Sequence, residues 1–548
     1  MRSTFMGLEA SKRGLFTQQS ALYTTGHNIS NANTEGYSRQ RVNMQTTLPY
    51  PGVGLNSPKT AGYIGTGVEA TSVQRYRDQF VDRQFRQEEN KLGYWTNQVR
   101  NLTQMEDILS EPSEYGLGQA FSEFWSSIQD VSTNPEDAAA RKVAVQKAQH
   151  IADSFQYIDK QLKMVQSNIG NELNVSTTEI NSLLKQIAEI NRQVQASEPN
   201  GYVPNDLYDA RDVLMDRLNE FVPVAFDRVP SGGNAVDIAE GSYTVYYTTA
   251  TGERVDLIDG RNYTQLNLIG NTGETVNGDN LNNLFSEFTY TELADYETHY
   301  RAAQDGIDMI IEGSLVYEDF TGFKGSIISM IDSFGHTNIN GEPVGYYPNM
   351  LAKLDTLANV FATTFNEVHR QGYALKDNTS TTGLSMFESS VENTPISASN
   401  IKVIDEMMTD TSLFAASSKQ GEEGNGNWAL TLSNLQFKAL TGEAQVGADG
   451  TNVIMTSDLD GATFESFYQG MIGQLAVDTR EADTVRFNSE TLKLTISNSR
   501  ASMSSVSLDE EMTNMITFQQ AYNANARMLT AIDEMLDKII NGLGRVGL

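Results

Sequence analysis

The C-terminal end of the chain carries the pattern that most restricts how it can fold. Over residues 508–546, apolar side chains recur every three and four residues, and ten of the twelve places on this seam are apolar. Such a helix needs a partner, because an isolated helix of this length is marginal in water. The two polar places hold Glu511 and Asn525, and an asparagine in such a seam can fix its register. We expect nine residues to form the contact: Leu508, Met515, Phe518, Tyr522, Leu529, Ile532, Leu536, Ile539 and Leu543.

A narrower stripe of apolar residues lies near the N-terminus. Leu8, Leu15, Leu22 and Ile29 recur every seven residues and therefore share one face of a helix. We expect this face to contact the C-terminal seam. One clear apolar place per heptad buries little surface, so helices of neighbouring subunits would complete the packing. The alternative is that both ends pack on the helical body of the same chain.

An asparagine-rich turn ends the N-terminal helix. The stretch NISNANTEGYSRQRV, residues 28–42, brings together turn-forming residues and an aromatic side chain, namely Asn28, Asn31, Asn33, Gly36 and Tyr37. We expect this turn to redirect the chain toward the body of the protein. Residues 38–41 are expected to begin an exposed, extended segment.

Long helices flank a middle region of different composition. Between residues 134 and 197 apolar side chains alternate by three and four; NPED at 134 predicts an N-cap at Asn134, and SEPNG predicts the end. Residues 226–346 hold 19 acidic and 5 basic side chains. Within them, YTVYYTTATGERVDLI (243–258) is typical of two strands around a glycine turn. Helical periodicity returns after residue 348.

These patterns predict an α+β multidomain protein. Long N- and C-terminal helices would form a coiled-coil or helical-bundle rod that carries an inserted β-rich domain. We predict a terminal coiled-coil assembly domain from residues 1–60 and 505–548. Residues 61–225 and 347–504 would form the rod of long helices, with mixed short elements at 374–460, and residues 226–346 the acidic outer domain.

Composition excludes several classes of function. The chain has 39 basic and 70 acidic side chains, a net charge of −31, which disfavours nucleic acid as a general partner. It has no cysteine, which excludes disulfides, thiolate metal sites and a cysteine nucleophile. Its five histidines are far apart, and no nucleotide-binding motif follows a predicted strand. We therefore expect a non-enzyme with no catalytic, cofactor or metal site, no membrane insertion and no cleaved signal peptide.

Three stretches resemble a known family. TTGHNISNANTEGYSRQRV (24–42) is similar to the N-terminal signature of the flagellar axial family of rod, hook and hook-associated proteins. SLDEEMTNMITFQQAYNANARMLTAIDEMLDKII (507–540) and LDTLANVFATTFNEVHRQGY (354–373) resemble segments of the branch found at the hook–filament junction. The resemblance is close over about residues 1–110 and 460–548 and weak over 226–346.

The resemblance implies a function that the residue patterns do not give. It implies a structural ring of identical subunits between hook and filament, outside the cell, exported through the flagellar type III apparatus. Its partners would be hook protein, hook-associated protein 3 (FlgL) and a FlgN-type export chaperone at the C-terminal region. The family's terminal helices are disordered in the monomer and form an inner tube on assembly.

Three alternatives remain open. The chain could be another axial protein of the distal rod or hook type, which the position of the native protein on isolated hook–basal bodies would reveal. It could be a secreted enzyme on an axial frame, with an active site in residues 226–460. It could also be a cytoplasmic coiled-coil scaffold, which predicts no protein on the cell surface.

Overall fold

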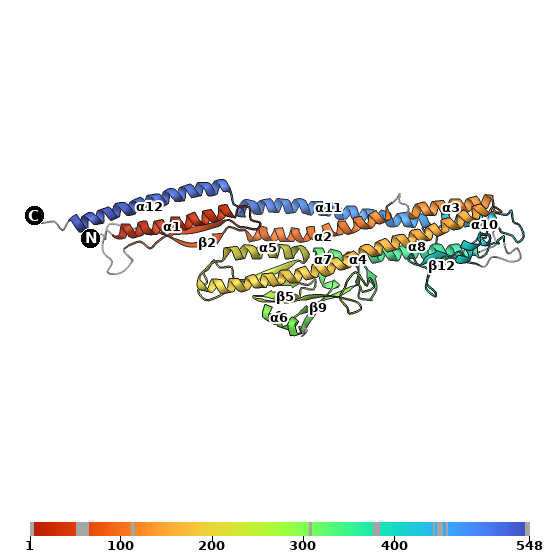
Figure 1. Cartoon of the computed structure of the whole chain (residues 1–548), viewed down its shortest axis with the longest axis horizontal. Helices are drawn as coiled ribbons and strands as arrows, with labels where there is room; N and C mark the ends of the chain where they lie inside the picture. The colour runs from red at the N-terminus through yellow and green to blue at the C-terminus, as the bar shows by residue number, and fades with distance from the viewer. Residues whose placement is uncertain are drawn as a thin grey trace, which may run out of the picture.

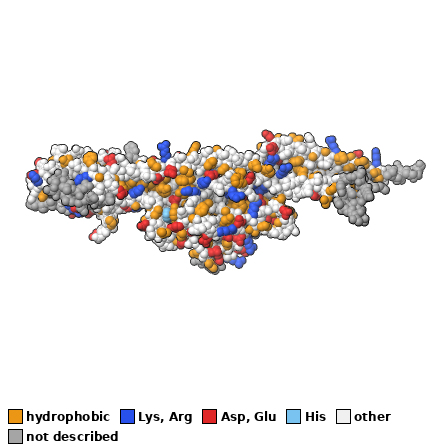
Figure 2. Space-filling model, turned by 180° about the vertical axis from the view of Figure 1, so that it is seen from behind, with side chains coloured by type: hydrophobic (Ala, Val, Ile, Leu, Met, Phe, Trp, Pro, Cys, Tyr) orange, Lys and Arg blue, Asp and Glu red, His pale blue; other side chains and the backbone are white. Residues whose placement is uncertain are grey.

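The molecule is a long rod with one bulge on its side (Figure 1). The computed structural model describes residues 5–50, 65–110, 116–305, 309–375, 384–441, 444–446, 453–455 and 459–542. Both ends of the chain lie at one end of the rod, and the helices of the body extend from there to the opposite end. In the space-filling view, acidic and basic side chains are interspersed over the bulge (Figure 2).

The two ends of the chain form one unit, which we call the terminal unit. Helix α1 (Phe5–Ser30) lies beside helix α12 (Leu508–Gly542). Strands β1 (Gln40–Thr46) and β2 (Val68–Arg75) form an antiparallel ribbon against α1, with Gln40 opposite Arg75. The terminal unit therefore contains an antiparallel ribbon as well as the two terminal helices that periodicity predicts.

Long helices build the body. Helix α2 (Gln79–Leu109) runs along α11 (Phe464–Ser504), and α3 (Leu117–Thr133) packs on α4 (Ala138–Ser197). The remaining body helices are α5 (Asn205–Phe221), α8 (Tyr346–His369), the short α9 (Asp405–Thr409) and α10 (Asn427–Ser433), with 3-10 turns η1 (Glu198–Asn200), η3 (Thr411–Leu413) and η4 (Asn434–Phe437).

The sequence prediction placed one helix start three residues too early. Asp137, not Asn134, is the N-cap of α4, and its Oδ1 accepts a hydrogen bond of 2.8 Å from the backbone N–H of Ala139. Asn134 instead closes α3, where its N–H donates to the carbonyl of Asp130. Both residues favour helix ends, so the local sequence alone does not decide which helix each one serves. The end of α4 agrees with the prediction, since Gly201 has a φ of 83° just after it.

The bulge contains the two larger sheets. One has the order β3-β4-β5-β6, and in the other β8 joins β7, β9 and β10, with β11 at the edge beyond β10. Strand bounds are β3 Val224–Val229, β4 Ser242–Thr248, β5 Arg254–Asp259, β6 Asn262–Tyr263, β7 Leu266–Gly270, β8 Phe285–Thr291, β9 Ile311–Val316, β10 His336–Thr337 and β11 Pro343–Val344. Helices α6 (Tyr296–Asp305) and α7 (Ser326–Phe334) and the 3-10 turn η2 (Tyr317–Phe320) lie between these strands in the chain. Short hairpins β12–β13 (Phe387–Ser389, Ile401–Val403) and β14–β15 (Ala444–Val446, Val453–Met455) complete the fold.

An aromatic cluster holds the end of the body that lies far from the chain termini. The ring of Phe361 on α8 lies 5.1 Å from that of Phe121 and 5.5 Å from that of Phe464, so α3, α8 and α11 meet there. Phe361 is fully buried, and such aromatic contacts contribute beyond the area that they bury. The fold is α+β, with long helices at both ends of the chain and a β-containing middle, as the sequence predicts.

Candidate assembly interface

Helix α1 meets its neighbours through small and polar residues. Its buried positions are Ser11, Gly14, Thr17, Ala21, Thr25 and Asn28. A methyl group at Gly14 would lie 2.9 Å from Oδ1 of Asn525, and one at Gly7 would lie 3.2 Å from Cδ1 of Ile532. The predicted stripe of Leu8, Leu15, Leu22 and Ile29 is only half-buried. Periodicity identified the helix, but α1 comes closest to α12 at two glycines, Gly7 and Gly14, and not at its leucines.

The predicted seam of α12 is buried to different degrees along its length. Ile532 and Leu536 are buried, whereas Met515, Phe518, Tyr522 and Leu529 are half-buried. At the two ends of the seam, Leu508 is 48% exposed and Ile539 is 44% exposed. Leu543 lies outside the described residues. In the terminal unit, α1 covers the middle and later turns of the seam but leaves its ends open.

Asn28 holds the turn between α1 and the ribbon. It is almost fully buried, its Nδ2 donates to the carbonyl of Gln40 at 2.9 Å, and its Oδ1 accepts from the N–H of Gln40 at 3.0 Å. The hydroxyl of Tyr37 donates to the same Oδ1 at 2.8 Å. An asparagine amide offers both a donor and an acceptor, so Asn28 binds Gln40 as a strand neighbour would. Burial, followed by nearby acidic residues, raises the pKa of Tyr37 and keeps its hydroxyl a donor.

The other signature residues shape the same turn. The backbone of Asn31 and its side chain both donate to the carbonyl of His27, and Asn33 is exposed. Gly36 has a φ of 77°, and a methyl group there would lie 2.1 Å from Cγ2 of Val213 on α5. Only glycine combines that conformation with so close a contact. The expectation of an exposed segment after the turn is wrong at Ser38 and Gln40, because α5 covers this stretch.

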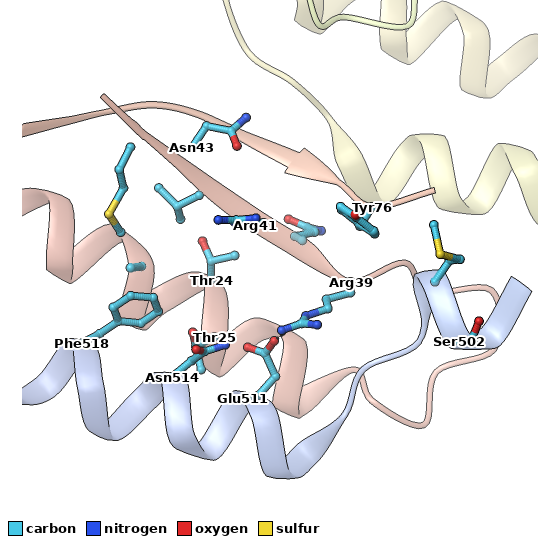
Figure 3. Close-up of a pocket in the computed structure, with 15 residues that line it drawn as sticks. Thr24, Thr25, Arg39, Arg41, Asn43, Tyr76, Ser502, Glu511, Asn514 and Phe518 are labelled. Carbon is cyan, nitrogen blue, oxygen red and sulfur yellow. Dashed lines mark hydrogen bonds and ion pairs between the residues drawn. The ribbon is translucent and has the colours of Figure 1, made fainter. Parts of the chain in front are cut away.

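Arg39 joins the N-terminal signature to the C-terminal one. Its Nε donates to Oε1 of Glu511 at 2.7 Å, and its Nη1 donates to Oε2 of Glu510 at 2.6 Å. Its backbone N–H donates to the carbonyl of Ser504, the last residue of α11. Arg39 and Glu511 line a groove of about 660 Å³ between α1, β1, α11 and α12, together with Phe518 (Figure 3).

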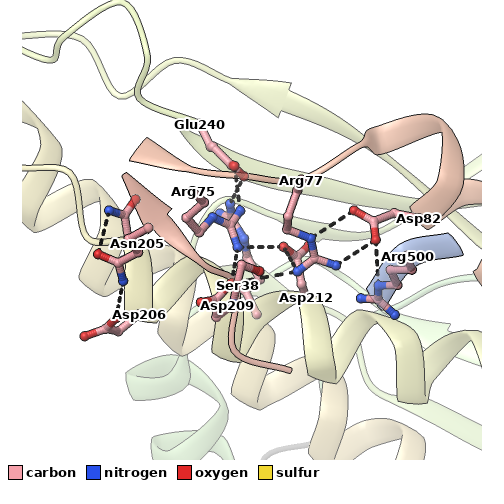
Figure 4. A network of polar contacts seen from close by, with 12 residues as sticks. Ser38, Arg75, Arg77, Asp82, Asn205, Asp206, Asp209, Asp212, Glu240 and Arg500 are labelled. Carbon is pink, nitrogen blue, oxygen red and sulfur yellow. Dashed lines mark hydrogen bonds and ion pairs between the residues drawn. The ribbon is translucent and has the colours of Figure 1, made fainter. Parts of the chain in front are cut away.

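A cluster of buried charges connects the terminal unit to the body (Figure 4). We call it the joint cluster; it contains five arginines and five carboxylates, Arg75, Arg77, Arg86, Arg211, Arg500, Asp82, Asp209, Asp212, Asp216 and Glu240. Asp212 is at its centre, with Nη1 of Arg75 and Nη1 of Arg77 both at 2.9 Å and Nη2 of Arg86 at 3.1 Å. Every charged group of the joint cluster has at least one oppositely charged partner, and Arg228 at its edge also pairs with Glu240 at 3.1 Å, which offsets part of the cost of burying these charges.

The two central carboxylates differ in proton affinity. Burial acts to raise the pKa of Asp212, but Arg77, Arg75 and Arg86 outweigh it, so this pKa lies well below its ordinary value. Burial raises the pKa of Asp209 above its ordinary value, since only Arg75 and the N–H of Ser38 bind its oxygens closely. Asp212 is therefore firmly ionised at neutral pH and is the anionic centre of the joint cluster.

The described part of the chain contains neither a candidate metal site nor a candidate membrane-spanning helix. No three histidine, aspartate or glutamate side chains gather there in a way that suits a metal ion. Nor does any helix in the described ranges combine the length and apolar character needed to cross a bilayer.

Comparison with known proteins now identifies the family. The chain is 38% identical over 99% of its length to flagellar hook-associated protein 1 of Bacillus subtilis, of which 99% is covered. This chain belongs to the flagellar hook-associated protein 1 (FlgK) family. The FlgK relative of Escherichia coli is 25% identical, over 96% of this chain and 98% of that protein.

Three family profiles match different parts of this chain. The profile of the FlgK helical domain matches residues 102–387, that of the flagella basal body rod protein matches 8–37, and that of the FlgEFG C-terminal region matches 498–542. The solved structure of the flagellar hook junction protein FlgK from Burkholderia pseudomallei aligns with a TM-score of 0.56, at 13% identity. It covers 78% of this chain and all of that one, and supports the fold.

Sequence reasoning missed the charged part of this interface. It treated Glu511 as a gap in an apolar seam, although Glu511 is buried and binds Arg39. It also passed over Asp209, Asp212 and Asp216, whose spacing of three and four places them on one face of α5. That spacing, together with the RYR stretch at 75–77, was the available signal.

Proposed function

We propose that this protein is a structural adaptor that joins the flagellar hook to the filament as a ring of identical subunits, and that it catalyses no reaction. One observation carries the proposal. The two ends that match axial-family profiles pack against each other as α1 and α12 and still leave apolar side chains uncovered. Family membership supplies the place of action, the flagellum.

The uncovered side chains are large and numerous for so small a unit. They are between 54% and 70% exposed, and they are Phe5, Phe16 and Tyr23 on α1 and Met512, Ile516, Met528, Met535 and Ile540 on α12. Apolar surface of this kind is stabilised when a partner removes it from water. We propose that neighbouring copies of this chain cover these side chains. The predicted seam residues and the exposed residues around them would form the contact.

The finer assignments rest on the family resemblance. We assign assembly to residues 1–60 and 505–548, and the outward-facing surface to the acidic domain at 226–346. Hook protein and hook-associated protein 3 (FlgL) would be the neighbours along the axis, and a FlgN-type chaperone would bind the C-terminal region before export. Export would follow the flagellar type III route without a cleaved signal peptide, and the assembled protein would be extracellular.

A truncation tests the assembly role. Removal of residues 508–548 should leave a body with its helical and strand signals in circular dichroism, because the main core lies outside α12. The truncated chain should fail to join isolated hooks, and cells that carry it should be non-motile. Motile cells would overturn the proposal.

A surface change separates assembly from folding. Replacing both Met528 and Met535 by lysine puts charge on exposed positions of α12, so the monomer should keep its stability while attachment to hooks falls at least tenfold. The matched control is Val175→Lys on α4, which is also an exposed apolar residue but lies on the body. Equal attachment by both variants would contradict a contact through this face of α12.

The location of the native protein distinguishes the proposed function from the three alternatives. Labelled antibody on isolated hook–basal bodies should mark the distal end of the hook. A mark on the rod or along the whole hook would favour another axial role, and absence from the cell surface would favour a cytoplasmic scaffold. Turnover of a substrate by the purified protein would favour an enzyme on an axial frame.

A further inference from the structure

The joint cluster stands where the chain passes between the terminal unit and the body. The chain crosses there twice, from β2 into α2 at residues 75–79 and from α11 into α12 at residues 504–508. Arg77 lies in the first crossing and Arg500 lies one turn before the second. Both bind the same atom, Oδ1 of Asp82, at 2.8 Å. One carboxylate thus ties together the two crossings that attach the terminal unit.

Helix α5 supplies the body side of the joint cluster. Asp209, Asp212 and Asp216 lie on one face of this helix, and Arg75 binds the first two at 2.7 and 2.9 Å. Arg500 reaches from α11 to Oδ2 of Asp216 at 2.8 Å. The base of the ribbon and the end of α11 are therefore both held to the same face of α5. Figure 4 shows the ribbon side of this attachment, where Arg75 meets Asp209 and Asp212.

This attachment has a defined geometry because its bonds are directional. A guanidinium group is planar and donates in fixed directions, so a network of such groups fits one arrangement of its partners. Apolar contacts alone would allow the ribbon to slide or turn over α5. The joint cluster is mostly inaccessible to water, with Arg75, Asp209 and Asp212 all less than one-tenth exposed, so salt screens it weakly.

We propose that the joint cluster sets the angle between the terminal unit and the body, with Asp212 as its central positioning residue. The biological consequence rests on the proposed function, because a ring closes only if every subunit presents its terminal helices at the same angle. Asp212 acts through Arg75, Arg77 and Arg86.

Distance measurement tests the positioning role directly. The chain has no cysteine, so cysteines placed at two exposed residues, Thr71 on the ribbon and Ala196 at the end of α4, can carry spin labels without background. Double electron–electron resonance on the full-length chain should give one narrow distance distribution. Asp212→Asn, which keeps the shape of the side chain, should broaden that distribution at least twofold. A broad distribution in the unchanged chain would overturn the proposal.

Two further variants separate positioning from general stability. Asp227→Asn removes the same charge from an exposed pair with Arg254 and should leave the distribution unchanged. Arg77→Lys keeps the charge but loses the forked geometry, and it should broaden the distribution while the melting temperature of the body stays the same. If Asp212→Asn and Arg77→Lys both leave the width unchanged, or broaden it only with loss of body helix, the positioning role is wrong.

Attachment to isolated hooks distinguishes this proposal from the proposed function. The unchanged chain should attach, and Asp212→Asn should attach at least tenfold less well. If the unchanged chain does not attach, the adaptor function fails while the distance distributions still decide the role of the joint cluster. If Asp212→Asn attaches normally with a broadened distribution, the required angle is wrong and the adaptor function stands.

Discussion

Nε of Arg39 lies 2.7 Å from Oε1 of Glu511, so residues 472 positions apart in the chain share one ion pair. Arg39 belongs to the turn signature near the N-terminus, and Glu511 belongs to the first turn of α12. Glu511 is 3% exposed and Arg39 is 27% exposed, so the pair is shielded from water on one side. The pair explains why a glutamate stands in a mostly apolar seam.

A charge exchange tests this pair. Arg39→Glu and Glu511→Arg should each loosen the start of α12, because each places two like charges side by side where an ion pair stood. The double variant should recover part of the loss, with a coupling of about 0.5–3 kcal/mol from protection of the α12 amides against hydrogen exchange. The control is the exposed pair Arg486–Glu490 on α11, where the same exchange should show a coupling of about 0.5 kcal/mol or less. Equal coupling at both places would refute the role of Arg39.

Substitution by alanine should stabilise α1 at one of its glycines but not at another. Gly26→Ala should stabilise the helix by about 1 kcal/mol, because the added methyl group meets no atom within 4 Å. Gly14→Ala should lose that gain, because its methyl group would press on Asn525. Hydrogen exchange over α1 provides the measurement, and Asn525→Ala should restore the gain in the Gly14→Ala background. A gain at Gly14 without this second change would mean that α1 does not pack closely on Asn525.

His369 should make the body sensitive to acid. It is fully buried and neutral, with Nδ1 3.0 Å from the carbonyl of Leu384 and Nε2 accepting from the N–H of Ala415. Burial lowers the pKa of His369 to about 4, whereas the unfolded chain binds the proton near 6.5. The unfolded state therefore gains protons first as pH falls, and stability should drop by about 3 kcal/mol between pH 6.5 and 4.

Glutamine substitution isolates that contribution. His369→Gln should flatten the change in unfolding free energy over this pH range, measured by urea titration at each pH. His27→Gln is the control, because His27 lies at the surface beside Asp206 and is not enclosed by the body. An unchanged pH slope in His369→Gln would show that other groups cause the acid sensitivity.

Phe361 should dominate the aromatic cluster of the body. Phe361→Ala should cost about 3–5 kcal/mol, because it removes a fully buried ring and leaves a cavity between α3, α8 and α11. Phe487→Ala on α11 removes the same group from a position that is 63% exposed, and should change stability by at most about 0.5 kcal/mol. Thermal unfolding of the two variants gives the comparison, and similar melting temperatures would contradict this account of the core.

Local patterns were enough to predict several elements of this fold. The spacing of apolar residues revealed α12 and the length of α4, and SEPNG located the end of α4, because these signals depend only on neighbours in the chain. The asparagine-rich stretch likewise predicted the turn after Ser30. The composition of residues 226–346 distinguished the middle region from the helices around it.

Tertiary structure alone decided how these elements are joined. No local period links Arg39 to Glu511 or Arg77 to Asp212, because such pairs exist only after distant segments have packed. Nor could periodicity reveal that α1 approaches α12 through Gly14 rather than through its leucines. The periodicity of apolar residues indicates which face of a helix or strand is buried. The choice of partner depends on shape and charge on two surfaces at once, and that information arises only when the surfaces meet.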